Sequence, residues 1–232
     1  NTFVLEIMGL GMIALSAFLV IQTLSAPELS LYSQLLLILA IDSGLILFGV
    51  YPALLYLLAN RKNPYGWLYA ILGPALAAFA SGDSYFSLGL AIRNGKENLG
   101  IPRKIGSATF PLFALFGRAG TAMVSSVSFI VILKSYSSLG VTVPDLLWVV
   151  LFSFLTSFTL GSVPGLGTFV SLSILCGLYG GGYEEGYLIL KPVAPLLMSF
   201  SVLLDVVTAS FASMLIARHE KMQTDIEVKE YI

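Results

Sequence analysis

Charged residues are scarce in this sequence. Only 11% of its 232 residues are Asp, Glu, Lys or Arg, whereas 57% are hydrophobic. A soluble domain carries about a quarter charged residues, so this chain could not cover a water-facing surface without large apolar patches. The net charge of −1 gives no reason to expect a nucleic-acid partner. The composition therefore predicts a membrane protein in contact with the lipid bilayer.

Cysteine and histidine are almost absent, since each occurs once, as Cys176 and His219. A single cysteine excludes an internal disulfide and a cysteine-rich metal site. Cys176 has no evident base partner in the sequence, and neither paired acids nor a catalytic histidine are found. We therefore expect neither an enzyme nor a cofactor. The chain begins at Asn1 without a methionine, and we expect it to be a fragment of a longer protein.

Long apolar segments are abundant instead. A helix that crosses a bilayer needs roughly 20 apolar residues. Four segments meet this requirement, at residues 3–24, 31–58, 105–133 and 188–217. Shorter apolar runs lie between them and are interrupted by polar or glycine-rich sequences, at residues 81–84 and 161–167.

Basic residues indicate how these segments are arranged. Nine of the 12 Lys and Arg residues fall into three clusters, at 61–62, 93–104 and 218–229, and such clusters favour the cytoplasmic side. Residues 63–92 therefore begin and end on the same side of the membrane. Two crossings would need about 40 residues plus a turn, which is more than this stretch offers. We predict a re-entrant hairpin with its tip at residues 81–84.

The same argument, applied from the outer side, predicts a second re-entrant hairpin over residues 146–178, with its tip at 161–167. Segments 105–133 and 188–217 then each cross once, in opposite directions. Unwound backbone at membrane depth must be buried in protein or line an aqueous cavity. The fold predicted is an all-α membrane protein with two inverted re-entrant hairpin-plus-helix repeats around one polar site, an arrangement typical of secondary transporters.

Four regions follow from this pattern. They are two transmembrane helices (1–62), a first repeat with a cytoplasmic hairpin and a broken helix (63–136), a second repeat with an extracellular hairpin (137–218), and a cytoplasmic tail (219–232). We expect a multi-pass protein of the cell inner, or plasma, membrane.

Four sequences carry a family resemblance: the serine-containing turn from residue 83, FPLFALFGRAGTAM at 110–123, GSVPGLG at 161–167, and SMLIARHE at 213–220. In this order they resemble hairpin 1, helix 7 with its NMDGTA break, the VPG-x-G tip of hairpin 2, and the end of helix 8 of the dicarboxylate/amino acid:cation symporter family. The chain is thus similar to glutamate and aspartate transporters over nearly its whole length. The resemblance implies a glutamate-transporter-like transport domain and a homotrimer, formed through a scaffold mostly missing from this chain.

A substrate site follows from the resemblance together with the polar residues inside apolar segments. Its predicted members are Asp83, Ser84, Arg118, Thr121, Val163, Pro164, Gly165, Ser201, Asp205 and Thr208. The resemblance also implies a cation site, like the family's second sodium site, made by backbone carbonyls of Leu115, Ser157, Phe158 and Leu160. Sodium is the expected coupling ion, with a proton or no ion as alternatives.

Arg118 lies inside an apolar segment, where a charge costs roughly 2.5–3.5 kcal/mol. Three interpretations stay open: it binds a substrate anion, it forms a structural ion pair with Asp205, or the two form a charge relay. Asp205 acts either as a fixed countercharge or substrate amino-group acceptor, or as a proton carrier. Asp83 either binds a cation or caps the following helix, and capping is the more common role. Hydroxyl side chains in helices bond by default to their own backbone.

Two functions remain in competition. The first is an ion-coupled importer of a small carboxylate or amino acid, which works by alternating access with residues 163–167 as an outer gate. The second is a transport-inactive paralogue or channel-like sensing protein. The departures from the family pattern favour the second, because NMDGTA reads as Gly117, Arg118 and Ala119 in its first three positions, and the substrate-binding arginine of helix 8 reads Ser201.

Overall fold

The computed structural model describes residues 29–59, 65–136, 141–159 and 167–224, together with the single positions 17, 21 and 226. Within these residues every regular element is a helix, which confirms the all-α prediction. Three stretches are long and apolar enough to cross a membrane: Ser30–Leu58, Arg103–Tyr136 and Gly186–His219. They match three of the four predicted spans, and the remaining one, at 3–24, lies outside the described residues apart from two positions.

The first long stretch consists of α2 (Leu29–Leu45), the π-helical turn η1 (Ile46–Val50) and α3 (Tyr51–Ala59). Pro52 explains the irregular turn, because it has no N–H to donate to the carbonyl of Phe48, four residues earlier. The hydroxyl of Tyr65 donates to that carbonyl instead, at 3.4 Å. A proline inside the helix is thus tolerated because a side chain satisfies the carbonyl that it leaves free.

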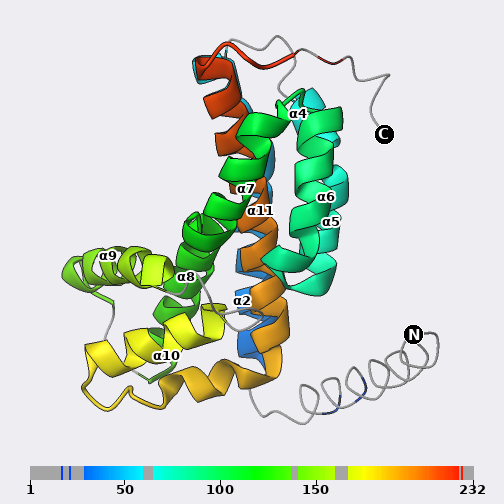
Figure 1. Ribbon diagram of the computed structural model, residues 1–232. Helices are drawn as coiled ribbons and strands as arrows, with labels where there is room; N and C mark the ends of the chain where they lie inside the picture. The colour runs from blue at the N-terminus through cyan, green and yellow to red at the C-terminus, as the bar shows by residue number, and fades with distance from the viewer. Residues whose placement is uncertain are drawn as a thin grey trace.

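The predicted first repeat begins with α4 (Tyr65–Ala70), α5 (Leu72–Ser81) and α6 (Ser84–Glu97). Helices α5 and α6 lie side by side and antiparallel (Figure 1). The turn between them is at the predicted place: Gly82 adopts a left-handed conformation with φ of 61°, which costs glycine little. At about 1.5 Å per residue, the 10 residues of α5 extend about 15 Å, half the thickness of a bilayer core.

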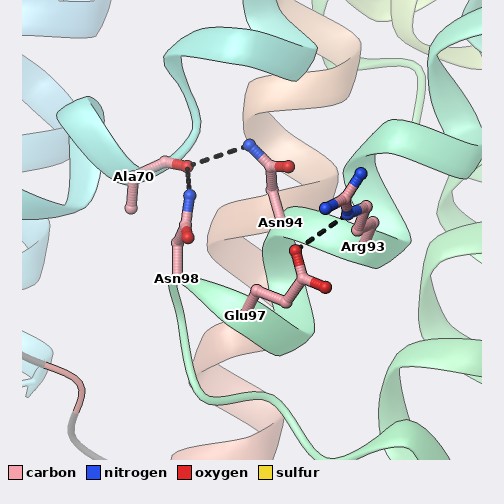
Figure 2. A network of polar contacts seen from close by, with 5 residues as sticks. All are labelled: Ala70, Arg93, Asn94, Glu97 and Asn98. Atoms are coloured by element: carbon pink, nitrogen blue, oxygen red, sulfur yellow. Dashed lines mark hydrogen bonds and ion pairs between the residues drawn. The ribbon is translucent and has the colours of Figure 1, made fainter. Parts of the chain in front are cut away.

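Two asparagines close the other end of this hairpin (Figure 2). Pro74 cannot donate to the carbonyl of Ala70, so the helix breaks between α4 and α5. The side-chain amides of Asn94 on α6 and of Asn98, the residue directly after α6, donate to this carbonyl at 3.4 and 3.1 Å, and both residues are buried. Because Pro74 leaves the Ala70 carbonyl free, this carbonyl can accept from the two asparagines, and these bonds join the start of α5 to the end of α6.

Next in the chain is a long helix in two parts, α7 (Arg103–Phe116) and α8 (Ala119–Tyr136), separated by Gly117 and Arg118. The predicted second repeat contains α9 (Val143–Thr159), α10 (Gly167–Tyr179), the 3₁₀ helix η2 (Gly186–Val193) and α11 (Ala194–His219). Residues 160–166 lie outside the described residues, and they include all of the predicted tip at 161–167 except Gly167.

A hydrogen-bonded contact joins the start of α9 to the end of α10. Asp145, in the first turn of α9, accepts hydrogen bonds from the hydroxyl of Thr142 at 2.6 Å and from its backbone N–H at 3.0 Å. On its other oxygen it accepts from the Tyr179 hydroxyl at the end of α10, at 3.1 Å. The bonds from Thr142 hold the pKa of the Asp145 carboxyl below its usual value. The start of one arm is thus tied to the end of the other.

Helix α11 is the centre of the fold and contacts α5, α6, α7, α8 and α10. In Figure 1 it runs through the middle of the molecule, with α5 and α6 on one side and α9 and α10 on the other. One apolar cluster joins its second half to α3, α5 and α7, and another joins α8 to α2, α9 and α10. Both predicted hairpins therefore pack around the same helix.

Candidate substrate site

The break between α7 and α8 is held by an acid from α11. Asp205 is buried, and its Oδ1 accepts from the backbone N–H groups of Gly120 and Thr121, at 2.7 and 3.2 Å. Its Oδ2 accepts from the hydroxyl of Thr121 at 2.8 Å. The first N–H groups of a helix have no acceptor within the helix, and the N-terminus attracts negative charge. Asp205 therefore caps α8 from a distant part of the chain.

Gly120 allows the two helices to meet this closely. A Cβ atom at this position would overlap the carbonyl oxygen of Ser201 and lie 2.9 Å from the backbone nitrogen of Asp205. Any larger residue would push α8 away from α11 and stretch the bonds to the carboxylate. Gly120 is therefore a structural part of the site, although its position in the sequence did not reveal this role.

Arg118 lies at the break itself and is 6% exposed. Its charge acts on the Asp205 carboxylate. Its Nη1 is also 3.1 Å from the point where a Cβ on Gly167, the first residue of α10, would lie. The buried cation is thus in contact with the base of the second predicted hairpin tip.

A hydrogen bond joins that base to α11. The hydroxyls of Thr168 and Ser201 are 2.7 Å apart, and both residues are buried. Ser201 also donates to the carbonyl of Met198 in its own helix, so Thr168 is the donor between the two. Helix α10 therefore begins in direct contact with α11, one turn from Asp205.

A cavity of about 500 Å³ opens beside the helix break. Its walls come from α7, α8, α9 and α11. The lining residues in the described part of the chain are Leu112, Phe113, Phe116, Gly117, Arg118, Ala119, Ala122, Phe154, Ser157, Phe158 and Thr208. Ligand sites of this volume are common in proteins and hold small organic molecules.

A second cavity, of about 10 Å³, is lined by residues of α6, α7 and α11 and has room for about one water molecule. Ser84, Asp205 and Ala209 are among its lining residues. Asp205 thus lines a small, mostly apolar space next to the first hairpin tip, whereas Arg118 lines the larger cavity.

Comparison with known proteins agrees with this architecture. The sequence model of the sodium:dicarboxylate symporter family matches residues 1–219. The chain belongs to this family. It is 28% identical to human excitatory amino acid transporter 2 over 203 residues, which cover 86% of this chain and 34% of that protein. The mouse protein of the same name is 28% identical over 185 residues, covering 78% of this chain and 32% of that protein.

A second kind of relative matches a shorter part. Human neutral amino acid transporter B(0) is 33% identical over 75 residues, which cover 32% of this chain and 14% of that protein. The chain spans about a third of the length of the excitatory amino acid transporters that it matches. Membership in the symporter family confirms the resemblance inferred from the four sequences.

Within this symporter fold the predicted substrate residues that the structure describes divide into four groups. Arg118 and Thr208 line the large cavity, whereas Ser84 and Asp205 line the small one. Thr121 donates a hydrogen bond to Asp205, and the hydroxyl of Ser201 is hydrogen-bonded to that of Thr168. Asp83 caps α6 by accepting from the N–H of Tyr85 at 2.8 Å, the more common of its two expected roles. Val163, Pro164 and Gly165 lie outside the described residues.

Three of the four predicted cation-binding carbonyls belong to residues near helix C-termini. Leu115 is in the last turn of α7, and Ser157 and Phe158 are in the last turn of α9. Carbonyls in a last turn have no donor within the helix and carry partial negative charge. Ser157 and Phe158 line the large cavity, and the fourth residue, Leu160, lies outside the described residues.

Other residues of the site were not predicted. Thr168 comes from the start of α10, directly after Gly167 of the predicted gate. Tyr51 of α3 hydrogen-bonds to Thr208, which itself donates to the carbonyl of Leu204. Thr168 could have been predicted from its position, because it directly follows the predicted hairpin tip. No local signal in the sequence pointed to Tyr51, because its contact spans 157 residues.

Proposed function

We propose that this chain is the substrate-carrying part of a secondary active transporter, an ion-coupled importer of a small carboxylate or amino acid. The observation that supports it best is the break between α7 and α8. There Asp205 accepts hydrogen bonds from the N-terminus of α8, beside the buried Arg118. Discontinuous helices that meet at membrane depth are the binding-site architecture of secondary transporters. Membership in the symporter family supports the same function.

Arg118 is the residue proposed to pair with the substrate carboxylate, and Asp83, Ser84, Thr121, Ser201 and Thr208 are proposed as further members of the site. Alternating access would move the hairpin-bearing part past a scaffold, with residues 163–167 as the outer gate. The bond between Thr168 and Ser201 connects the base of that gate to α11, so a ligand at the site could shift the open and closed populations.

Sodium is the proposed coupling ion, with the carbonyls of Leu115, Ser157, Phe158 and Leu160 as its ligands and a proton as the alternative. An ion that orders the gate raises the affinity for substrate, and the substrate raises the affinity for the ion by the same factor. The first three carbonyls are near helix C-termini, where a cation is favoured.

The assembly that we propose is a homotrimer in the plasma membrane, formed through a scaffold outside this chain. Its organisation would follow the four regions 1–62, 63–136, 137–218 and 219–232. The three basic clusters at 61–62, 93–104 and 218–229 would face the cytoplasm.

Uptake by the full-length protein in liposomes tests the function. Labelled aspartate, succinate and leucine are supplied under an inward sodium gradient, an inward proton gradient, or neither. We expect gradient-dependent uptake of one of them, and we expect Arg118→Ala to abolish it while the thermal unfolding midpoint stays within about 5 °C. Arg93→Ala is the matched control, since Arg93 is a largely exposed arginine paired with Glu97 at 2.9 Å (Figure 2). Near-normal uptake by Arg118→Ala would reject this arginine as a ligand.

One observation favours the second candidate, a transport-inactive or channel-like member of the family. Asp205 is the single acid of α11, and both of its oxygens are engaged by α8. A carboxylate held in this way has a structural role. Binding of labelled aspartate with and without sodium separates the two functions, because an inactive member would show no saturable binding and no effect of sodium.

A further inference from the structure

Asp42 is an acid in the middle of a stretch long and apolar enough to cross the membrane, Ser30–Leu58. At about 1.5 Å per residue, it lies about 18 Å along the helix from Ser30 and about 24 Å from Leu58. An acid at this depth is rare in membrane proteins, and it is almost always paired or turned towards the protein interior or a water-filled cavity. The surroundings of Asp42 therefore indicate what this part of the helix contacts.

One side of this stretch packs against the rest of the described chain. Its buried residues recur every three or four positions, as in a helix with one covered side: Tyr32, Leu35, Leu39 and Ser43. On the other side, four large apolar side chains are 59–65% exposed: Leu37, Ile41, Leu45 and Phe48. We call these four residues, together with Gly44 and Gly49, the open face. Asp42 is partly buried and lies at its edge.

This stretch is also the least covered of the three that could cross a membrane. In its most apolar part, 28% of the residues are buried, compared with 67% for the stretch Gly186–His219. A Cβ added at Gly44 or at Gly49 would have nothing within 4 Å. Small residues let the backbones of two membrane helices approach closely. The open face therefore has the form of a surface for a further helix.

Asp42 has no partner within the part of the chain that the structure describes, where it makes neither a hydrogen bond nor an ion pair. The sequence offers no cation at its depth. Nine of the 12 Lys and Arg residues are in the three clusters near the ends of apolar segments. Lys134 is in the last turn of α8, and Lys191 is in η2, near the start of the last long stretch. Arg118 is 6% exposed and acts on Asp205.

The same cations exclude a second copy of this chain as the partner, because none of them could reach Asp42 at the middle of the membrane. Residues 1–28 contain no Lys or Arg either. The chain spans about a third of the length of the excitatory amino acid transporters that it matches, so proteins of this kind have other segments that could supply a cation.

We propose that Asp42 forms an ion pair with a Lys or Arg on a transmembrane helix outside this chain, and that this helix packs on the open face. The pair would give the carboxylate its countercharge, and Gly44 and Gly49 would allow the two helices to approach closely. The proposal rests on the part of the proposed function that places a scaffold outside this chain, and it does not depend on transport.

The thermal unfolding midpoint of the full-length protein in lipid nanodiscs, without substrate, tests the pair by the sign of an effect. Removing one member of a buried pair leaves the other charge uncompensated, so Asp42→Leu should lower the midpoint by about 5 °C or more. The matched control Asp42→Glu keeps the charge and should stay within about 2 °C of the wild type. If Asp42 faced lipid or water without a cation, Asp42→Leu would raise the midpoint, and the proposal would be overturned. Wild-type stability of Asp42→Asn would indicate an uncharged donor and would also reject the ion pair.

A charge exchange identifies the partner. Asp42→Lys should lower the midpoint more than Asp42→Leu, because it places two cations together. In this background, each Lys or Arg inside a predicted span of the rest of the full-length protein is replaced in turn by Asp. We expect one replacement to restore about half or more of the lost midpoint. If none does, or if those spans contain no Lys or Arg, the proposal fails. Uptake in liposomes is measured separately: a restored midpoint without any wild-type uptake would reject the transport function and leave the pair standing.

Discussion

Replacing Asp205 by alanine should destabilise the fold more than any loss of a surface acid. The substitution leaves three buried donors without an acceptor, the N–H groups of Gly120 and Thr121 and the hydroxyl of Thr121. An unsatisfied buried donor costs roughly 1–3 kcal/mol, and a small cavity beside the site can admit water to relieve part of this cost. We expect Asp205→Ala to lower the free energy of unfolding by about 4 kcal/mol.

Two variants divide this loss into its parts. Asp205→Asn keeps an amide oxygen that can accept from the two N–H groups but removes the charge at the N-terminus of α8, so it should cost about 1–2 kcal/mol. Asp83→Ala is the matched control, since Asp83 accepts one bond from Tyr85 at the start of α6. Its loss should cost about 1 kcal/mol.

The measurement is equilibrium unfolding of the full-length protein in mixed micelles by titration with sodium dodecyl sulfate, followed by circular dichroism. The expected order of stability is wild type, Asp83→Ala, Asp205→Asn, and Asp205→Ala last. If Asp205→Ala were no less stable than Asp83→Ala, the hydrogen bonds from α8 to Asp205 would not be what stabilises the break between α7 and α8. If Asp205→Asn cost as much as Asp205→Ala, charge rather than hydrogen bonding would be the main contribution.

The remaining predictions concern how the helices are fastened together, and the same unfolding titration measures them. Replacing Asn94 and Asn98 together by alanine should cost about 2 kcal/mol, because the carbonyl that both amides bind is left without a donor. Adding Pro74→Ala to this double variant should recover about 1 kcal/mol of the free energy of unfolding, because alanine supplies a backbone N–H to the same carbonyl. If Pro74→Ala had the same effect in the wild type as in the double variant, this account would be contradicted. Gly120→Ala should cost about 3 kcal/mol or more and abolish uptake, because the new Cβ overlaps α11. The control is Gly177→Ala, where nothing lies within 4 Å of the new Cβ. This variant should be more stable than the wild type, by up to about 1 kcal/mol, because alanine favours a helix more than glycine does.

The sequence was sufficient to predict most of the helical plan. Segment lengths, the three basic clusters and the polar interruptions predicted the spans at 31–58, 105–133 and 188–217, and each is helical in the structure. The turn at 81–84 and the break at Gly117 and Arg118 were also predicted. These features are local: glycine, proline and a charge inside an apolar run change the backbone where they stand.

The sequence also predicted that Arg118 and Asp205 lie inside the protein, because a charge facing lipid is too costly. It left open what each side chain contacts. Tertiary structure decided that both oxygens of Asp205 bind the start of α8 and that Arg118 faces a separate apolar cavity.

The difference has a physical reason. Where a chain can cross or break depends on the hydrophobic length and backbone chemistry of neighbouring residues, which the sequence displays directly. Which donor meets which acceptor depends on the faces that packing brings together, across 85 residues for Gly120 and Asp205 and 33 for Thr168 and Ser201. Gly120 shows this most clearly, because its role depends on the position of a helix that begins 74 residues later in the chain.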